Sequence, residues 1–367
     1  MIVMQNMQLN PDRLKVARLR RKMTYSSLAS ASGLSSKSVA EYEKADGLFT
    51  PTQQTIELLA DTLGYPIGFL CGSDVEFVDP STVSFRSLKS MKAADQHAAE
   101  AAGSLGVMVN TFFEESFNLP ECNLPNLRGY ESEAAAETVR ERWGLGVKSI
   151  DNLIHLLEAN GVRVFSLSEN TLDVDAFSFW KNDTPYIFLN TQKSGERSRF
   201  DAAHELGHLV LHRHGSPQGK NLEDEADSFA SAFLMPRRTV LAIKMPFPTL
   251  DGIISIKENW RVSAVALIVR MKNIGMLTEW QYRILMVEAT KKGLRKSEIN
   301  GIARERSLII DKLLSVLKSD NIDFNKLSNI LSIPIDELAN LLFKVSVIEG
   351  GGTSTVRRSP DLKLIKQ

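Results

Sequence analysis

The chain has 367 residues, long enough for two or three domains, and its 44 lysine and arginine residues balance 44 aspartate and glutamate residues. This neutral balance excludes a uniformly basic or acidic protein, so any nucleic-acid surface must be local. The two cysteines, Cys71 and Cys122, form no CxxC pair, which favours a reducing compartment and excludes a zinc site built from thiolates. The N-terminus shows no signal-peptide pattern and no stretch approaches about 18 apolar residues, so we expect a cytoplasmic protein with no membrane partner.

Residues 9–72 have the spacing of a small helical bundle. A strongly basic first helix is predicted at 12–23, Thr24 can cap a second helix that ends at Gly33, and a third helix follows. A short helix, a glycine turn and a serine-rich helix are typical of a helix-turn-helix. The segment resembles the phage-repressor-like (XRE) DNA-binding domain, which implies double-stranded DNA as a partner.

That resemblance implies which side chains approach DNA. The recognition-helix candidates are Ser35, Ser36, Lys37, Ser38 and Glu41, and the candidates near phosphates are Arg21, Lys22 and Tyr42. Tyr25 stands where the family usually has a glutamine, and few of the groove candidates could bind guanine bidentately, so we expect modest sequence specificity. The alternative is a helical protein-binding module with a solvated basic helix.

Residues 73–127 are predicted to connect two domains. Residues 73–87 form a linker with a strand-like patch, and residues 88–117 form one long alanine-rich helix. We expect this helix to pack on the following domain or on a second copy of itself, so a homodimer is possible. Leu-Pro pairs at 119–120 and 124–125 bracket a short irregular segment.

A small sheet is predicted ahead of the most informative motif. Two helices, at 131–143 and 149–159, precede strands at 162–167, 174–180 and 185–189. An edge strand of such a sheet could pair with an extended peptide.

The motif is the pentad His204-Glu205-Leu206-Gly207-His208. On a helix, two histidines four residues apart lie on one face, where both imidazoles can reach a single metal ion. Glu205 could hydrogen-bond a water molecule at the open metal position. Two histidine ligands and an adjacent glutamate are the groups that metal-assisted hydrolysis of a peptide bond requires.

A third ligand must come from beyond His208. His214 would face away from the ligand side because Leu211 replaces the glycine that could break the helix, and His212 lies about 12 Å along the axis from His204 at about 1.5 Å per residue. Glu223 is the better candidate, since it begins a second predicted helix, at 222–236, with Asp227 one turn later to hydrogen-bond a ligand histidine. Glu225 is the fallback ligand.

The two motifs together, HELGH and then E-x-x-A-D-x-F-A-x-x-F-L-M-P, resemble the ImmA/IrrE family of zinc metallopeptidases, which are gluzincin-like in their ligand set. The similarity continues in ERWGLG at 141–146, LLEANGVRVF at 156–165 and the run at 256–283, so it covers about residues 128–293. It implies one zinc ion per chain, held by His204, His208 and Glu223, with Glu205 as the base.

The remaining chain is predicted to be helical. Helices at 250–260 and 263–273 have helix-turn-helix spacing, but the second is mostly apolar, and we interpret the pair as support for the peptidase. Residues 294–349 form a C-terminal helical region and 350–367 a flexible tail. Glu298-Ile299 replaces the family's usual Glu-Pro, so the resemblance does not define this region.

The sequence therefore predicts a mainly α protein with a small β-sheet (α+β), made of domains at 9–72, 128–293 and 294–349. Our leading hypothesis is a DNA-binding zinc endopeptidase that cleaves a repressor or antitoxin in a stress, phage or mobile-element response. One alternative is a transcriptional regulator whose peptidase-like domain senses or docks, and another is autocleavage within 73–87 or 119–127. Tyr186, His212 and His214 are candidates to stabilise the oxyanion.

Overall fold

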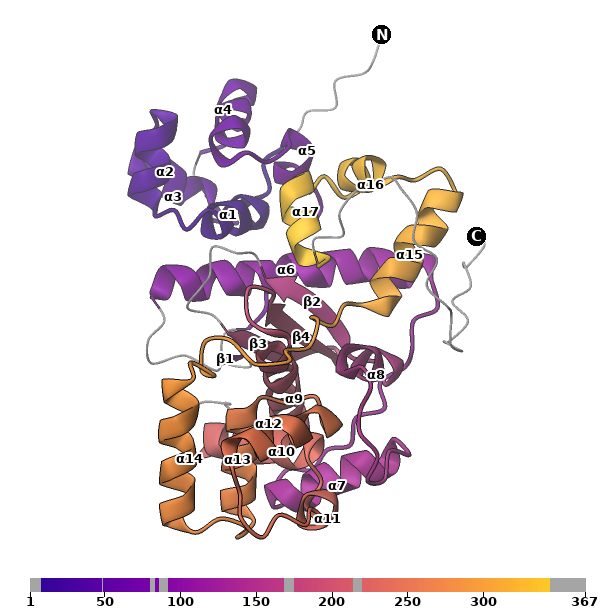
Figure 1. Ribbon diagram of the computed structural model, residues 1–367. Helices are drawn as coiled ribbons and strands as arrows, with labels where there is room; N and C mark the ends of the chain where they lie inside the picture. Colours follow the sequence, from indigo (N-terminus) through magenta and orange to yellow (C-terminus); the bar gives the residue numbers. More distant parts are fainter. Residues whose placement is uncertain are drawn as a thin grey trace.

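The computed structural model describes residues 8–47, 49–79, 83–85, 92–167, 175–213 and 220–343. Within these ranges the chain is mainly helical with one small sheet, which confirms the predicted α+β class. Figure 1 shows a helical bundle at the N-terminal end, a long helix beneath it, the sheet, and a second group of helices on the far side. The predicted tail at 350–367 and the histidine at 214 lie outside the described residues.

The N-terminal bundle contains five helices. They are α1 Pro11–Arg20, α2 Tyr25–Ser32, α3 Ser36–Tyr42, α4 Gln53–Leu63 and α5 Ile67–Leu70. Thr24 caps α2 and exchanges hydrogen bonds with Ser27 in a capping box, and Gly33 ends α2 at φ +70°, a left-handed conformation that favours glycine. The Ser35 side chain then caps α3. The turn between α2 and α3 thus forms for the local reasons that predicted it.

Within the described residues the sheet has four strands, in the order β1-β3-β4-β2. The strands are β1 Ser84–Phe85, β2 Arg163–Leu167, β3 Ala176–Lys181 and β4 Thr184–Asn190. β3 and β4 form a hairpin, β2 joins β4 in parallel, and β1 pairs antiparallel with β3. Three strands match the predicted positions, and the fourth comes from the strand-like patch of the linker.

Helices cover both faces of the sheet. On one face lies α6 Ala93–Ser116, where Gly103 and Gly106 allow close packing against the rings of Phe179 and Phe188. On the other face lies α9 Gly195–Leu211, whose Leu209 carbonyl accepts a hydrogen bond from the Trp180 indole N–H at 3.1 Å. Because α1 packs on the outer side of α6, the long helix joins the bundle to the sheet (Figure 1). The expectation that it packs on the following domain is confirmed.

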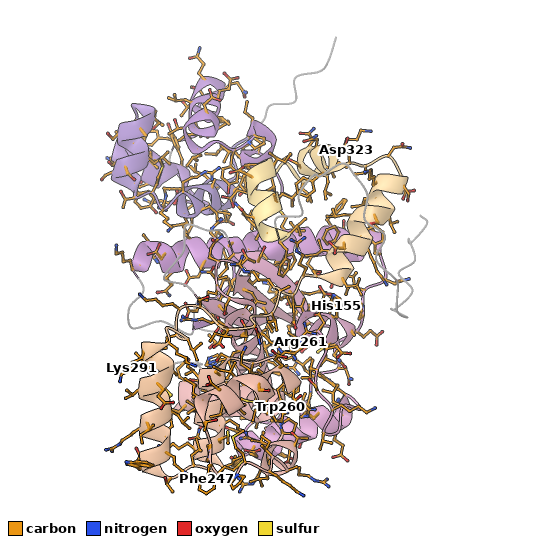
Figure 2. The ribbon with its side chains drawn as sticks, in the orientation of Figure 1. His155, Phe247, Trp260, Arg261, Lys291 and Asp323 are labelled. Carbon is orange, nitrogen blue, oxygen red and sulfur yellow. The ribbon has the colours of Figure 1, made fainter. Side chains whose placement is uncertain are left out.

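A group of helices supports α9 from the side away from the bundle. They are α7 Ser132–Arg142, α8 Leu153–Ala159, α10 Lys220–Leu234, α11 Arg237–Leu241, α12 Leu250–Ile256, α13 Ala264–Asn273 and α14 Glu279–Lys291. The apolar α13 packs on α10. This contact agrees with the interpretation of the helix pair as support for the peptidase-like domain. Trp260 and Arg261, labelled in Figure 2, lie between α12 and α13. The Trp260 indole donates to Thr239, and Arg261 donates to the Asp151 carbonyl. These bonds fix the support helices to neighbouring segments.

The last described residues return to the N-terminal bundle. Residues 295–306 cross the start of α9, where Glu196 accepts a hydrogen bond from the Ile302 amide at 2.8 Å and Arg199 pairs with Glu305. Three helices follow, α15 Leu308–Ser319, α16 Phe324–Leu331 and α17 Ile335–Leu341. Glu337 of α17 forms a buried ion pair with Arg20 of α1, with 2.7 Å between Oε2 and Nη2. The N-terminal bundle and the last described helix therefore contact each other, and the domain boundary placed at residue 293 stays a prediction.

Among the helices that the structure describes, none combines the length and the apolar character needed to cross a membrane.

Candidate metal centre

Two helices that follow each other in the chain, α9 and α10, build the site. Nearly the whole of α9 is buried. Gly207 lets α10 come close, since a Cβ at this position would lie 3.1 Å from the Phe229 ring and 3.3 Å from the Ala226 Cα. A larger residue at 207 would push α10 away. The glycine inside the pentad therefore sets the distance across which the two helices share a ligand.

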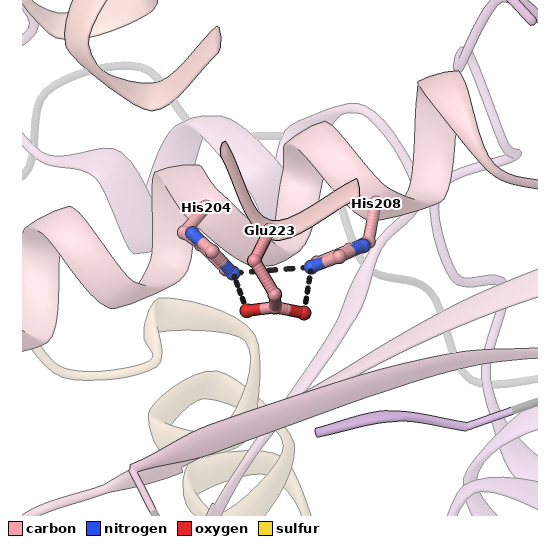
Figure 3. Close-up of side chains that lie close together, drawn as sticks. All are labelled: His204, His208 and Glu223. Atoms are coloured by element: carbon pink, nitrogen blue, oxygen red, sulfur yellow. Dashed lines mark hydrogen bonds and ion pairs between the residues drawn. The ribbon is translucent and has the colours of Figure 1, made fainter. Parts of the chain in front are cut away.

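His204 and His208 of α9 and Glu223 of α10 point toward one another (Figure 3). The two Nε2 atoms are 3.1 Å apart, and each lies near a different oxygen of Glu223, at 3.4 Å for His204 and 3.3 Å for His208. One donor atom from each residue lies within 4.8 Å of the others. Two imidazole nitrogens and a carboxylate oxygen that converge in this way could hold a metal ion, and zinc accepts this donor set.

The protonation of these groups suits metal binding. Burial lowers the pKa of His208 to about 4, so its imidazole is neutral near pH 7 and offers a lone pair. Burial alone would raise the pKa of Glu223, but hydrogen bonds with His204 and His208 lower it to about 2. Metal ligands must be deprotonated, and these two groups already are at neutral pH.

Each imidazole has a second partner on its far nitrogen. Asp227 Oδ1 lies 2.8 Å from His204 Nδ1, the contact that the sequence predicted. His212 Nδ1 lies 2.9 Å from His208 Nδ1, and His212 Nε2 lies 3.0 Å from Glu225. Such partners fix the orientation of a ligand imidazole.

The contact of His212 and Glu225 with the site was missed by the sequence reasoning. His212 was placed at the helix end and Glu225 was kept only as a fallback ligand, whereas the two together support His208. The sequence spacing could have indicated this contact, because His212 follows His208 by four residues and so lies one turn further along the same helix face.

Glu205 lies within α9 and is fully buried, at 0% exposure. Its Oε2 accepts a hydrogen bond from the Ser178 hydroxyl of β3 at 2.6 Å. Tyr186, a candidate for the oxyanion, instead bonds Asn110 of α6 at 2.8 Å on the opposite face of the sheet. That prediction is wrong for Tyr186, because the alternation of side chains along β4 directs it away from α9.

A cavity of about 720 Å³ lies beside the site, between α9, α10, α13 and residues 294–298. Asp227 lines it, but its lining includes neither His204, Glu205 nor His208. The cavity therefore borders the outer partner of one imidazole and does not reach the pentad.

The predicted DNA-contact residues divide into two groups. On α3 and its cap, Ser35, Ser36 and Lys37 are exposed, and Ser38, Glu41 and Tyr42 are partly exposed. Arg21 and Lys22 instead face the protein. Arg21 bonds the Leu63 carbonyl at 2.7 Å and Glu337 at 3.0 Å, and Lys22 pairs with Asp95 of α6 at 2.5 Å. The structure therefore brings the α3 residues together on a surface and places Arg21 and Lys22 at the junction between the bundle and the rest of the chain.

Comparison with known families agrees with both regions. Residues 157–272 match the family model described as the IrrE N-terminal-like domain, a peptidase family, and residues 14–70 match a helix-turn-helix model. No curated protein matches the sequence. The matches confirm the architecture expected from the motifs, a helix-turn-helix domain followed by an IrrE-like, peptidase-type domain. They support a DNA-binding regulator with a peptidase-like domain.

Proposed function

We propose that the chain is a DNA-binding zinc endopeptidase that acts as a regulator in the cytoplasm by cleaving a protein of the repressor or antitoxin class. Its context would be a stress, phage or mobile-element response. The observation that carries the proposal is the convergence of His204 and His208 of α9 with Glu223 of α10 around one point, next to Glu205 of α9. A purely structural helix gains nothing from burying two histidines and a glutamate together.

In this proposal His204, His208 and Glu223 hold one zinc ion, and Asp227 and His212 keep the two imidazoles oriented. A bound zinc ion would supply Lewis acidity, polarising the scissile carbonyl and lowering the pKa of a water molecule. Glu205 would take the proton from the attacking water and deliver it to the leaving amine. The Ser178 hydroxyl would hold the Glu205 carboxylate in place between these transfers.

The DNA-binding role is assigned to the exposed surface of α3. Ser35, Ser36 and Lys37 begin this helix and could enter a major groove, while Ser38, Glu41 and Tyr42 lie next to them. Ion pairs join the helix-turn-helix domain to α6 and α17. In this proposal the helix-turn-helix domain and the peptidase-like domain are therefore mechanically connected. A homodimer on DNA stays a prediction.

The test is the variant Glu205→Gln, which keeps the size of the side chain but removes its basicity. We expect it to retain zinc and to lose hydrolysis of an unfolded protein such as casein by about 10²- to 10⁴-fold, the usual contribution of a general base. Zinc content and cleavage are measured on the same preparations of the full chain. Equal cleavage by wild type and Glu205→Gln would overturn the role of the base.

A second candidate is a regulator that senses metal without proteolysis. It is favoured by the complete burial of Glu205 and by the continuous path from α9 through the sheet and α6 to α1. In that case His204→Ala would change DNA affinity by the same factor as zinc removal, and zinc-loaded wild type would cleave no protein. If His204→Ala leaves DNA affinity unchanged, the sensor hypothesis is excluded.

A further inference from the structure

The outer edge of β3 is occupied by a segment of the chain's own linker. β1, Ser84–Phe85, pairs antiparallel with β3, with Ser84 opposite Ser178 and Phe85 opposite Phe177. Val83, just before it, is completely buried. An isolated pair of two-residue strands contributes little by itself, so this buried neighbour anchors the segment.

The register places β1 beside Glu205. Directly opposite residues of an antiparallel pair project their side chains to the same face of the sheet, about 4.5–5.5 Å apart at Cβ. Ser178 contacts Glu205 on the α9 face, so Ser84 lies on that face as well. Ser84 is 1% exposed, and its hydroxyl has no hydrogen-bond partner among the described residues. A buried hydroxyl without a partner carries a free-energy cost, which indicates that the pairing is not selected for stability alone.

The same edge is where a peptide would have to approach. Glu205 contacts β3, and the large cavity on the Asp227 side does not reach it. An extended peptide can add to an exposed sheet edge through main-chain hydrogen bonds. Here β1 pairs with the part of β3 that lies next to Glu205, so this edge is occupied. Glu205 itself has no exposed surface.

The linker is also fastened ahead of this contact, at two residues between the bundle and β1. Glu76 pairs with Lys181 at the end of β3, at 2.7 Å, and the Val78 amide approaches the Ser104 hydroxyl of α6 at 3.4 Å. Residues 75–79 follow directly from the helix-turn-helix bundle, whose Arg13 bonds the Ser73 carbonyl at 2.7 Å. A movement of the bundle that breaks its contacts with α6 and α17 would therefore strain these linker contacts, which lie between the bundle and β1.

We propose that residues 83–85 occupy the place of an extended peptide substrate along β3 and thereby keep the peptidase closed. This inference rests on the proposed peptidase function. The segment would be released when a partner of the helix-turn-helix bundle draws the linker away from α6. The substrate would then pair with β3 in place of β1 and present a small side chain, like that of Ser84, next to Ser178.

The test compares the zinc-loaded full chain with Val83→Asp, in which a buried charge should expel the segment, and with Ser84→Pro, which removes a strand amide without introducing a buried charge. Ser84→Ala is the matched control, because it keeps the strand and removes only the unpartnered hydroxyl. Thermal melting identifies any variant that fails to fold, and Ser84→Pro then replaces Val83→Asp in the comparison.

Two readouts are measured. Amide hydrogen exchange over 176–181 reports on the pairing and needs neither metal nor substrate. Binding of a synthetic extended peptide hydroxamate reports on access to the site. In the open variants we expect faster exchange in β3 and about tenfold tighter hydroxamate binding, the ratio for a wild type that is open one-tenth of the time. Ser84→Ala should bind the hydroxamate no more tightly than wild type.

Unchanged exchange in the open variants would overturn the proposal, since β1 would not be protecting β3. Faster exchange with unchanged hydroxamate affinity would also overturn it, since the pairing would not block the site. Failure of the peptidase function is a separate result, namely open variants that bind the hydroxamate but cleave casein no faster than Glu205→Gln does.

Discussion

The metal centre draws its candidate ligands and the partners of their imidazoles from two consecutive helices, all between residues 204 and 227, and only the Ser178 partner of Glu205 comes from β3. The helix-turn-helix domain uses its charged residues differently. Arg20 pairs with a glutamate 317 positions later in the chain, and Lys22 pairs with Asp95 of the long helix. Charged groups in the centre therefore meet near neighbours in the sequence, whereas Arg20 and Lys22 meet remote segments of the chain.

The difference shows that a basic helix is not necessarily a nucleic-acid surface. Arg13, Arg18 and Arg20 are buried, and Arg18 binds Glu43 through both oxygens, at 2.6 and 2.7 Å. The serine-rich start of α3 is an exposed part of the helix-turn-helix domain, and Lys37 is its exposed cation. The domain therefore uses Arg20, Arg21 and Lys22 to attach itself to the body of the protein and Arg18 to hold its own helices together.

The largest effect is expected from Glu337→Ala, which tests this attachment. The variant leaves the buried guanidinium of Arg20 without its carboxylate, and breaking a buried pair in this way costs about 3–5 kcal/mol. Urea unfolding measures the loss. Asp336→Ala is the control, since its side chain is 63% exposed and lies 3.9 Å from Arg21, so it should cost about 1 kcal/mol or less. Equal losses of unfolding free energy in the two variants would contradict the claim that the Arg20–Glu337 pair attaches the bundle to α17.

A second long-range junction should respond to pH. Burial raises the pKa of Glu158 to about 7, although Ser307 and the amides of Leu308 and Ile309 donate hydrogen bonds to it. Between its ordinary pKa near 4.5 and this value the folded state binds more protons than the unfolded state, so stability falls as pH rises. The expected loss is about 3 kcal/mol by the usual conversion.

The matched variant for this junction is Glu158→Gln, which cannot ionise. Its carbonyl oxygen can accept from the amides of Leu308 and Ile309, and its NH2 group can donate to the Ser307 hydroxyl oxygen. Unfolding free energies of both proteins are compared at about pH 5 and pH 7.5, on either side of most of the transition. Wild type should lose more stability than Glu158→Gln over this interval. A parallel pH dependence in the two proteins would show that Glu158 ionises normally.

Within the metal centre the expected effect is smaller but specific. Asp227→Ala removes the partner of His204 Nδ1, and loss of such a partner typically weakens metal binding by about 10- to 100-fold. Zinc affinity is measured by competition with a chromophoric chelator. Asp224→Ala is the control because Asp224 lies on the same helix and is exposed. Similar affinities for these two variants would show that Asp227 does not orient the ligand.

The smallest effect should be on DNA binding by the helix-turn-helix domain. Lys37→Ala removes an exposed charge on α3, so the slope of log affinity against log salt for duplex DNA should fall by about 0.9 for each lost phosphate contact. Lys22→Ala should leave that slope unchanged, because Lys22 already pairs with Asp95. The reverse pattern would restore the original assignment of Lys22 to the phosphates.

The sequence was sufficient wherever the controlling interactions are local. Thr24 and Gly33 delimit α2 through their own backbone and side-chain geometry, and the spacing of His204, His208 and Glu223 follows from helical periodicity on two adjacent helices. Asp227 was found for the same reason, as the residue one turn after Glu223.

The sequence was insufficient wherever a partner comes from a distant part of the chain. Nothing near Arg21 in the sequence indicates Glu337, and nothing near Ser84 indicates that it will lie opposite Ser178. The face occupied by Tyr186 depended on the register of β4 in the sheet, which a short apolar run does not define. Strand pairing and buried ion pairs are decided by tertiary packing.

The measurement that tests the central claim most directly is the zinc content of purified wild type, Glu223→Ala and Glu225→Ala after mild dialysis. If the three donors hold the ion, wild type should carry about one zinc per chain, Glu225→Ala should keep it and Glu223→Ala should lose it. A wild type that takes up no zinc even when the ion is supplied, or a Glu223→Ala variant that keeps its zinc, would contradict the assignment of the site.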